Sequence, residues 1–366
     1  MMAIYLIGAL CLGLGYFLLL SKYATLWESL SIYLEEDKSR SEKVSVLVPF
    51  RNEESNLPVL IKSIQELAES MHEIEFIFIN DHSTDSSVKI LEALIPGARV
   101  LNLEKETGKK AGVSEGIRYA TGDIILQTDA DCILPSDWIN EMVRPFEDSA
   151  IKLVSGPVRF TDAKNFWGKL VNLDFAALIA IGAAHIEWGK PLMCNGANMA
   201  YRKREVEDMA FNTEKASGDD VFLLQYIAKN HQDSICFLKS KRALVYTDGP
   251  KTFTEFWNQR LRWSSKNGDY EDKTNIWVLI MIWLYNVIIV VSLMSLHPTG
   301  FLVAAFLILF KILAEDKFYG TFSEFFGINL WFKNLLFGQP FHILYMVILP
   351  PISQLLKYKW KERKVR

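Results

Sequence analysis

Charged residues are absent from four long stretches of this 366-residue chain, at 3–20, 276–296, 299–310 and 341–356. A helix of about 18–20 apolar residues can cross about 30 Å of hydrocarbon. The first two stretches therefore predict transmembrane helices. The third and fourth are shorter, so a full span and a re-entrant or interfacial segment are both open for 299–314 and 341–356.

Between the first two stretches, the pattern changes to alternating strands and helices. Short apolar runs predict buried strands, and apolar residues at helical spacing predict the helices between them. The strands are expected at 44–49, 74–80, 98–103 and 124–128, and the helices at 57–67, 88–94 and 108–119. This order predicts an α/β fold with a mostly parallel central sheet and helices on both faces. A dinucleotide-binding fold would need G-x-G-x-x-G after the first strand, and PFRNEE contains no glycine.

These patterns divide the chain into five parts. They are an N-terminal transmembrane anchor (1–21), a polar connector (22–42), a central domain (43–270), a C-terminal transmembrane region (271–356) and a basic tail (357–366). Residues 3–20 lack the preceding Lys or Arg and the A-x-A site of a signal peptide, which favours an uncleaved anchor with Lys22 in the cytoplasm.

The basic tail KYKWKERKVR is also expected in the cytoplasm. A cytoplasmic central domain followed by three full spans would instead place the tail outside. Either one of the two shorter stretches does not span, or the charge rule is broken. Residues 164–188 predict an amphipathic helix on the membrane face, with an ordinary core helix as the alternative.

Composition narrows the class of protein. The formal net charge is −3, which argues against a nucleic-acid partner. The four cysteines, Cys11, Cys132, Cys194 and Cys236, show no paired or metal-binding spacing, which suggests a reducing compartment.

Polar side chains follow three of the predicted strands. Asn52 and Glu53 follow the first, Asp81 follows the second, and Asp129 and Asp131 follow the fourth. Ligands of such sheets bind beyond the carboxyl ends of the strands. Asp129 and Asp131 are two residues apart and point to the same side, where their oxygens suit Mg²⁺ or Mn²⁺.

Seven segments then resemble family 2 glycosyltransferases, in that family's order and spacing. They are VSVLVPFRNEESNL (44–57), INDHSTDSS (79–87), GKKAGVSEGI (108–117), TGDIILQTDAD (121–131), CNGANMAYRK (194–203), GDDVFLL (218–224) and QRLRW (259–263). The resemblance implies a GT-A fold, the fold of nucleotide-diphospho-sugar transferases.

The resemblance also implies roles for individual residues. Asp220 would be the general base, with Asp219 supporting it, and Asp129 and Asp131 would be the D-x-D motif that holds a metal. Asp131 would be the more direct ligand, and Asp129 contacting only ribose is an alternative. Trp263 would bind the acceptor. The donor would be bound by Pro49, Asn52, Glu53, Asp81, Lys109, Lys110, Asp129, Gly196, Asn198, Gln259 and Arg262.

The chain departs from the family pattern in two places. Asn80-Asp81-His82-Ser83 stands where the family usually has Asp-Asp-Gly-Ser, and Asp219 replaces the usual Glu. Structural alternatives remain for single residues. Asp219 is also suited to cap a helix, and Trp263 to anchor a helix at a membrane interface.

The resemblance predicts an inverting, metal-dependent glycosyltransferase that uses a nucleotide-diphosphate sugar, a UDP-sugar for preference, and a lipid or lipid-linked acceptor. The alternatives are a processive polysaccharide synthase, a non-enzymatic membrane scaffold and a nucleotidyltransferase. We predict an integral protein of a bacterial inner membrane with its catalytic domain in the cytoplasm.

Overall fold

The computed structural model describes residues 2–31, 41–104, 106–161, 165–207, 209, 218–231, 233–264, 273–329, 332–355, 358–360 and 363–365. The chain forms two compact units. The sheet-bearing unit comprises residues 29–161 and 181–249. The helical unit comprises residues 1–28, 162–180 and 250–366. The predicted central domain (43–270) is therefore divided between the two units, because residues 162–180 and 250–270 belong to the helical unit.

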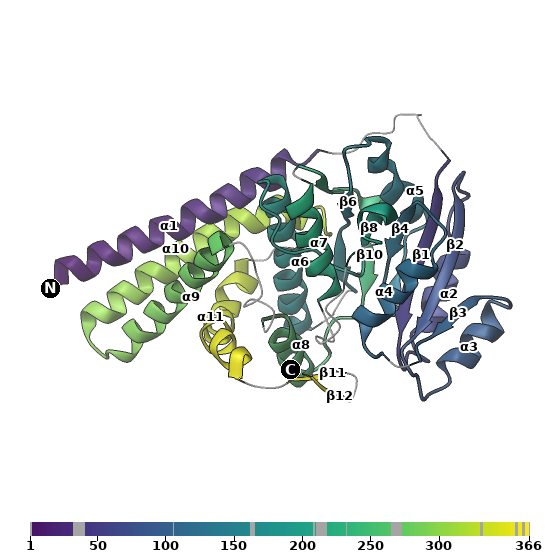
Figure 1. The fold of residues 1–366 in the computed structure, drawn as a ribbon. Helices are drawn as coiled ribbons and strands as arrows, with labels where there is room; N and C mark the ends of the chain where they lie inside the picture. Colours follow the sequence, from purple (N-terminus) through teal and green to yellow (C-terminus); the bar gives the residue numbers. More distant parts are fainter. Residues whose placement is uncertain are drawn as a thin grey trace. The chain divides into compact units, whose positions relative to one another are not determined.

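The four predicted strands lie side by side in the sheet-bearing unit (Figure 1). A seven-stranded sheet has the order β3-β2-β1-β4-β8-β6-β9. The parallel half confirms the predicted topology, and β8 runs antiparallel to both of its neighbours. The strands are β1 (Lys43–Phe50), β2 (Glu73–Asn80), β3 (Arg99–Asn102), β4 (Ile124–Gln127), β6 (Leu153–Ser155), β8 (Met199–Arg202) and β9 (Ile235–Phe237).

A second sheet of three short strands completes this unit, in the order β5-β10-β7. Its strands are β5 (Cys132–Ile133), β7 (Val158–Phe160) and β10 (Val245–Thr247). The helices of the unit are α2 (Leu57–Gln65), α3 (Ser87–Leu94), α4 (Lys109–Tyr119), α5 (Trp138–Val143) and α7 (Asp219–Asn230), with 3₁₀ turns at Arg144–Glu147, Lys203–Glu205 and Lys241–Ala243.

The core of the sheet-bearing unit lies between the large sheet and helices α4 and α7. Leu47, Ile79 and Ile125 contribute alternate side chains from β1, β2 and β4, and they contact Val113 of α4 and Leu224 of α7. This packing fixes α4 and α7 on one face of the sheet, so the first residues of both helices are held relative to the end of β4.

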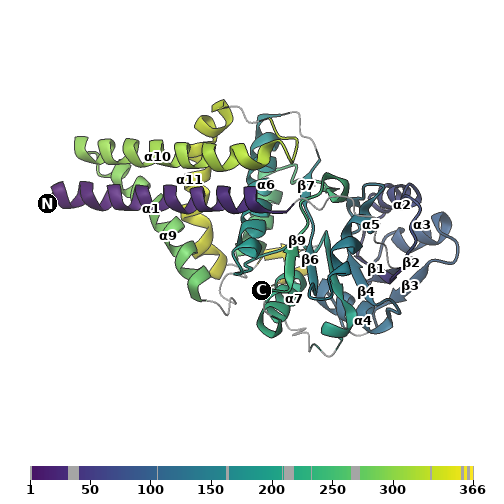
Figure 2. The same cartoon turned by 90° about the horizontal axis from the view of Figure 1, so that it is seen from above.

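The helical unit contains helices α1 (Met2–Ser29), α8 (Phe253–Ser264), α9 (Lys273–Met294), α10 (Pro298–Ser323) and α11 (Phe332–Leu355). It also contains the first part of α6 (Phe166–Glu187) and the hairpin β11 (Tyr358–Trp360) with β12 (Arg363–Val365). Helix α1 runs alongside α10 in both views (Figures 1 and 2). The Trp27 indole donates a hydrogen bond to the carbonyl of Thr321, with 3.1 Å between nitrogen and oxygen.

Within the described residues, five helices are long and apolar enough to cross a membrane: α1, α6, α9, α10 and α11. Four of them coincide with the predicted apolar stretches. Helix α1 continues eight residues past the predicted end of the anchor at residue 21, so the connector begins later than expected.

Helix α6 differs from the prediction of an amphipathic helix on the membrane face. In the most apolar 18-residue segment of α6, 67% is buried inside the protein. A helix that is apolar on all sides is typically enclosed by other elements. The structure therefore favours the alternative of a core helix.

Candidate active site

Three carboxylates surround one ammonium group at the end of β4. Asp129 lies two residues beyond the end of β4, whereas Asp219 and Asp220 are the first two residues of α7 and Lys109 is the first residue of α4. The Lys109 ammonium forms an ion pair with Asp129. Burial lowers the pKa of Lys109, but the charges of Asp129, Asp219 and Asp220 outweigh burial and raise it above its usual value. Residues from three elements therefore form one charged site.

Gln127, the last residue of β4, holds Asp219 in place. Its side-chain Nε2 donates a hydrogen bond to Asp219 Oδ2 at 2.7 Å, and its Oε1 accepts one from the Tyr201 hydroxyl at 3.4 Å. Asp219 is 2% exposed. Sequence reasoning counted Gln127 as part of an apolar strand. The sequence signal for Gln127 was its position as a polar residue at the end of an otherwise apolar strand.

Asp220 contacts the backbone of the segment that carries Gly196. Its Oδ2 accepts a hydrogen bond from the Gly196 amide at 3.4 Å, and its Oδ1 accepts one from the Val221 amide at 2.8 Å. A Cβ at Gly196 would lie 2.9 Å from Gln127 Nε2 and 3.2 Å from Lys109 Nζ. The protein's own side chains therefore approach Gly196 closely, and the donor-binding role of Gly196 remains a prediction.

The N-cap of α7 is Gly218, which has a φ of +98°. Asp219 is therefore not the cap of this helix but its first residue, with its carboxylate bonded to Gln127. Glycine at position 218 lets the chain turn sharply into the helix. This turn places two consecutive carboxylates at the helix N-terminus, where the helix dipole favours negative charge.

The loops after β1 and β2 are linked by hydrogen bonds. Asp81 is 4% exposed, and its Oδ2 accepts the Gly108 amide at 3.0 Å. Asn52 Oδ1 accepts the Thr84 amide at 2.8 Å. Asn52 and His82 have φ values of +51° and +55°. A left-handed backbone at position 82 explains why glycine suits that position in the family pattern.

Glu53 and Pro49 serve the local architecture in this structure. Glu53 is 7% exposed, its Oε2 accepts from Asn56 Nδ2 at 2.7 Å, and its amide donates to Ser87 Oγ at 2.8 Å. Pro49 pairs with Ile79 in the register of β1 and β2. The donor-binding roles of Glu53 and Pro49 remain predictions.

Two residues predicted to bind the donor, Lys110 and Asn198, make contacts within the protein. The Lys110 side chain is buried, and its Nζ lies 3.6 Å from the ring centroid of Phe222. Asn198 is fully buried, with its Nδ2 donating to the carbonyls of Pro157 and Ala243 at 2.8 Å each. Its Oδ1 accepts the Trp138 indole at 2.9 Å. The backbone and Trp138 use the Asn198 amide, and its donor-binding role remains a prediction.

The two metal-ligand candidates differ in their surroundings. Asp129 is paired with Lys109, whereas Asp131 is exposed. Cys132 is buried, and burial, Asp131 and Asp129 raise its pKa, so it remains a thiol and a poor metal ligand. Among the described residues, no three His, Cys, Asp or Glu side chains come together to hold a metal. The two carboxylates fit a hard divalent ion that takes its remaining ligands from phosphate and water.

The predicted Q-x-x-R-W motif lies on α8 in the helical unit. Gln259 Oε1 accepts from Arg260 Nη1 at 3.0 Å. The Trp263 ring stacks on Phe175, with ring centroids 5.7 Å apart, and the Arg260 guanidinium lies 4.4 Å from the Trp263 ring centroid. Trp263 is therefore used in packing within this unit. The roles of Gln259, Arg262 and Trp263 toward substrates remain predictions.

Comparison with known proteins agrees with the geometry. Residues 45–209 match the sequence profile of glycosyl transferase family 2. This match covers a little less than half of the chain and shows that the range is similar to glycosyl transferase family 2. The matched range contains Asp129, Asp131 and Lys109, and it ends before Asp219 and Asp220.

Two curated relatives and one solved structure show the extent of the similarity. The chain is 24% identical over 244 residues to a poly-beta-1,6-N-acetyl-D-glucosamine synthase of Staphylococcus epidermidis, covering 64% of this chain and 57% of the relative. It is 32% identical over 127 residues to a prophage bactoprenol glucosyl transferase homolog of Escherichia coli K12, covering 33% of this chain and 42% of the relative. The chain thus spans about half the length of the curated relatives it matches.

The solved structure is a mannosyltransferase from Pyrobaculum calidifontis in complex with GDP-Man and Mn²⁺. The alignment covers 97% of this chain and 99% of that chain, with a TM-score of 0.59 and 17% identity. At this identity the similarity shows the fold, which is GT-A as the resemblance predicted.

Proposed function

We propose that this protein is an inverting glycosyltransferase that moves a sugar from a nucleotide-diphosphate sugar to a lipid or lipid-linked acceptor. The observation that carries the proposal is the gathering of Asp129, Asp219 and Asp220 around Lys109 at the end of β4. A UDP-sugar is the preferred donor, because Asp81 provides a carboxylate that can accept the imide N–H of uracil.

Asp220 is the proposed general base. The acceptor hydroxyl oxygen attacks the anomeric carbon and gives its proton to the Asp220 carboxylate, while the bond from that carbon to the diphosphate oxygen breaks. The nucleoside diphosphate leaves with the electron pair, and the configuration inverts. Backbone amides of Gly196 and Val221 hold the Asp220 carboxylate for this step.

Lys109 and a divalent ion have complementary proposed roles at the leaving group. Lys109 is positioned to neutralise charge on the diphosphate. Mg²⁺ or Mn²⁺ held by Asp129 and Asp131 would supply further positive charge there. The Mn²⁺ in the Pyrobaculum mannosyltransferase supports a divalent ion as the cofactor.

The apolar helices and the lipid acceptor named in the bactoprenol relative support a membrane location. We place the catalytic unit in the cytoplasm at the inner membrane of a bacterium, because nucleotide sugars are expected on that side and Lys22 follows the first apolar stretch.

The decisive experiment compares Asp220→Asn with Asp123→Asn, an exposed carboxylate just before β4. Donor turnover is followed with purified protein in membranes, extracted lipid and a panel of UDP-, GDP- and dTDP-sugars. We expect Asp220→Asn to abolish transfer and keep donor affinity, and Asp123→Asn to behave as wild type. Equal loss of transfer and donor binding in Asp220→Asn would make Asp220 a binding residue and contradict its role as base.

A processive polysaccharide synthase is the second candidate. The similarity over 244 residues to the Staphylococcus poly-N-acetylglucosamine synthase favours it. The two candidates differ in product length: a single labelled glycolipid supports the first, and a ladder of long water-soluble product supports the second.

A further inference from the structure

Helices α1 and α10 run in the same direction, which determines the side of the membrane on which α10 ends. Tyr16 of α1 donates a hydrogen bond to Glu315 of α10 at 3.1 Å, and further along α1 the Trp27 indole donates to the Thr321 carbonyl. Both contacts advance toward the C-terminal ends, so the two helices are parallel. After α1 the chain enters the sheet-bearing unit at residue 29. We call the side on which α1 ends the near side, and α10 ends there too.

Helix α9 is antiparallel to α10 and begins on the near side. The two helices are joined by residues 295–297, and the Tyr285 hydroxyl donates a hydrogen bond to the Leu307 carbonyl at 2.7 Å. In an antiparallel pair, a step back along one helix corresponds to a step forward along the other. Trp283 of α9 and Lys311 of α10 therefore lie within about one helical turn of each other in depth. The connection at 295–297 lies on the far side, about 18–20 Å away along either helix.

Helix α11 passes across α9 and α10 at this depth. His342 Nδ1 lies 2.9 Å from Lys311 Nζ, and the Trp283 indole donates a hydrogen bond to the Val347 carbonyl at 3.1 Å. Positions 342 and 347 are about 7.5 Å apart along α11, yet their partners lie at nearly the same depth. A helix that crossed the membrane beside α9 and α10 would change depth together with its partners. Figures 1 and 2 both show α11 running across the direction of α1 and α10.

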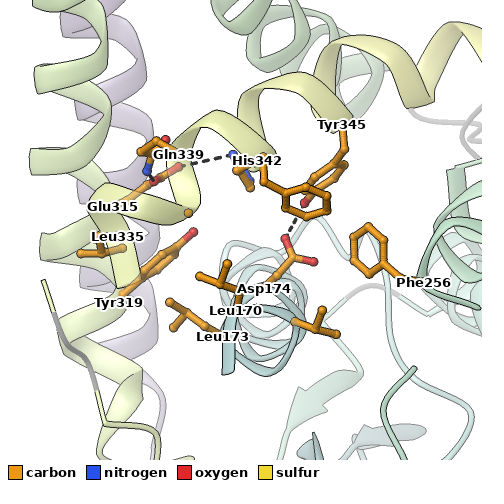
Figure 3. A pocket seen from close by; sticks show the side chains of 13 residues that line it. Leu170, Leu173, Asp174, Phe256, Glu315, Tyr319, Leu335, Gln339, His342 and Tyr345 are labelled. Atoms are coloured by element: carbon orange, nitrogen blue, oxygen red, sulfur yellow. Dashed lines mark hydrogen bonds and ion pairs between the residues drawn. The ribbon is translucent and has the colours of Figure 1, made fainter. Parts of the chain in front are cut away.

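Both ends of α11 turn toward the near side. Toward its start, Gln339 donates a hydrogen bond to Glu315, which is one turn beyond Lys311 toward the near end of α10 (Figure 3). Toward its end, the hydroxyl groups of Ser353 and Ser264 are hydrogen-bonded at 2.9 Å. Ser264 is the last residue of α8 and precedes α9, which begins on the near side. Helix α11 therefore starts and ends in the near half of the helical unit.

Helix α8 accompanies α11 along this path. Phe256 packs on Phe341 with ring centroids 5.4 Å apart, and Ser264 meets Ser353 further along both helices, so α8 and α11 are parallel neighbours. Helix α8 has 12 residues and carries Glu255, Arg260 and Arg262, so it is too short and too polar to cross a membrane. A helix that lies along such a neighbour shares its depth.

Charged side chains are concentrated at the same depth of the helical unit. A pocket lined by α6, α8, α10 and α11 contains the carboxylates of Asp174 and Glu315 (Figure 3). Asp174 is paired with Arg260, and Glu315 is paired with Lys311. Charges are costly at the centre of a bilayer and are tolerated near its surface or when they are buried and paired. Their position agrees with a location of α11 in the near half of the membrane.

The outer face of α11 is apolar. Its inner face is formed by Leu335, Ile343, Tyr345 and Leu349, which are buried. Phe337, Leu344 and Ile348 are 65%, 51% and 41% exposed. Their spacing of seven and four residues places these three side chains on one face of the helix, which we call the apolar stripe. Exposed apolar side chains at this depth match the acyl chains of lipids.

We propose that α11 is embedded in the near leaflet without crossing the membrane, with its apolar stripe against the acyl chains of that leaflet. Strands β7 and β10, which precede and follow α6, pair with each other, so α6 does not change sides either. Of the described helices, α1, α9 and α10 then cross the membrane.

The basic tail 357–366 consequently lies on the near side, together with the sheet-bearing unit. That the near side is the cytoplasm rests on the proposed function. On that side the Lys and Arg residues of the tail follow the charge rule and meet anionic phospholipid head groups. An α11 that does not span removes the conflict between the basic tail and three full spans after the central domain.

The test determines on which side three positions of the full chain lie in bacterial spheroplasts. A cysteine is placed between α9 and α10 (Ser295→Cys), in the tail (Val365→Cys) or in the sheet-bearing unit (Asp123→Cys). A membrane-impermeant maleimide is added before or after permeabilisation. Labelled chymotryptic peptides are identified by mass spectrometry, which separates the new cysteine from the native ones.

We expect Ser295→Cys to be labelled in intact spheroplasts. Val365→Cys and Asp123→Cys should be labelled at least tenfold more after permeabilisation than before it. Labelling of Val365→Cys but not Asp123→Cys in intact spheroplasts would place the tail opposite the sheet-bearing unit and overturn the proposal. Labelling of both from outside would leave α11 uncrossed and would instead overturn the cytoplasmic location in the proposed function.

A second measurement uses the wild-type chain and tests the contact with lipid. The protein is placed in nanodiscs of phosphatidylcholine that carries a diazirine on an acyl chain, and the crosslinked residues are mapped after illumination. We expect crosslinks at Phe337, Leu344 and Ile348. Leu309 of α10, which is 53% exposed, is the matched control on a crossing helix. Crosslinks at Leu309 without any on α11 would show that the apolar stripe is covered by protein, such as a second copy of this chain, and would overturn the lipid contact.

Discussion

The Gln127 amide and the Asp219 carboxylate share a hydrogen bond of 2.7 Å between the end of β4 and the start of α7. Both residues are buried. The bond holds an acidic residue of the site to the central strand of the sheet. Asp220, the next residue in the chain, is thereby fixed relative to Asp129 at the same strand end.

Gln127→Leu should uncouple Asp219 from the sheet. The Asp219 carboxylate would lose its buried donor, which costs about 1–3 kcal/mol of unfolding free energy. We expect transfer to fall at least tenfold while donor affinity changes less than twofold, as measured by titration calorimetry and product formation. Tyr201→Phe removes only the longer 3.4 Å bond to Gln127 and should have a smaller effect. Wild-type transfer in Gln127→Leu would contradict the positioning role.

The two adjacent lysines provide a matched pair. Lys109 contacts the carboxylates of the site, whereas Lys110 is buried against Phe222. We expect Lys109→Met to weaken donor binding about tenfold, which corresponds to about 1.4 kcal/mol. Lys110→Met should leave donor affinity unchanged, because its methylene chain fills the same space. Equal weakening of donor binding in both variants would contradict the different roles that we assign to Lys109 and Lys110.

Metal dependence is expected to require Asp131. Because its carboxylate is exposed at the end of β4, removal leaves the fold intact. Asp131→Ala should abolish the effect of Mn²⁺ or Mg²⁺ on donor affinity, and Asp123→Ala should retain it. Donor binding is measured with added metal and with EDTA. If wild-type binding is the same in both conditions, the metal assignment fails.

Asn198 should matter for stability and not for donor recognition. Asn198→Ala leaves the Trp138 indole and the carbonyls of Pro157 and Ala243 without their partner, at a combined cost of about 3–5 kcal/mol. Asn195→Ala is the control, because it removes a single hydrogen bond to the Ala197 amide. Thermal unfolding of the full chain measures both. A loss of donor affinity at unchanged unfolding temperature would contradict this purely structural role and support donor binding by Asn198.

The sequence predicted the parallel strands because their burial makes them uniformly apolar, as at residues 44–49. It missed β7 because Val158-Arg159-Phe160 is three residues long, carries a charge and pairs with a strand more than 80 residues away. The strand propensity of a short segment contains no information on a pairing strand that is distant in the sequence.

The site was predicted through its carboxylates, whereas Gln127 and the pocket were not. Asn198 was assigned to the donor through the family resemblance, and the sequence alone does not reveal that its amide is buried. For the pocket, Lys311 and Glu315 lie four residues apart in an otherwise apolar helix. That charged pair was a usable signal, but it lies just beyond the charge-free stretch 299–310, and the sequence analysis did not single it out.

The pairing of α1 with α10 has a consequence for biosynthesis. Tyr16 donates a hydrogen bond from its hydroxyl to Glu315, and Trp27 donates one to the Thr321 carbonyl, so α1 finds these partners only after about 300 further residues have been made. The sheet-bearing unit is complete once residue 249 has been made. Helix α1 lacks these partners until α10 has also been made, so a nascent chain stalled before α10 would leave the aromatic face of α1 open to chaperones and proteases.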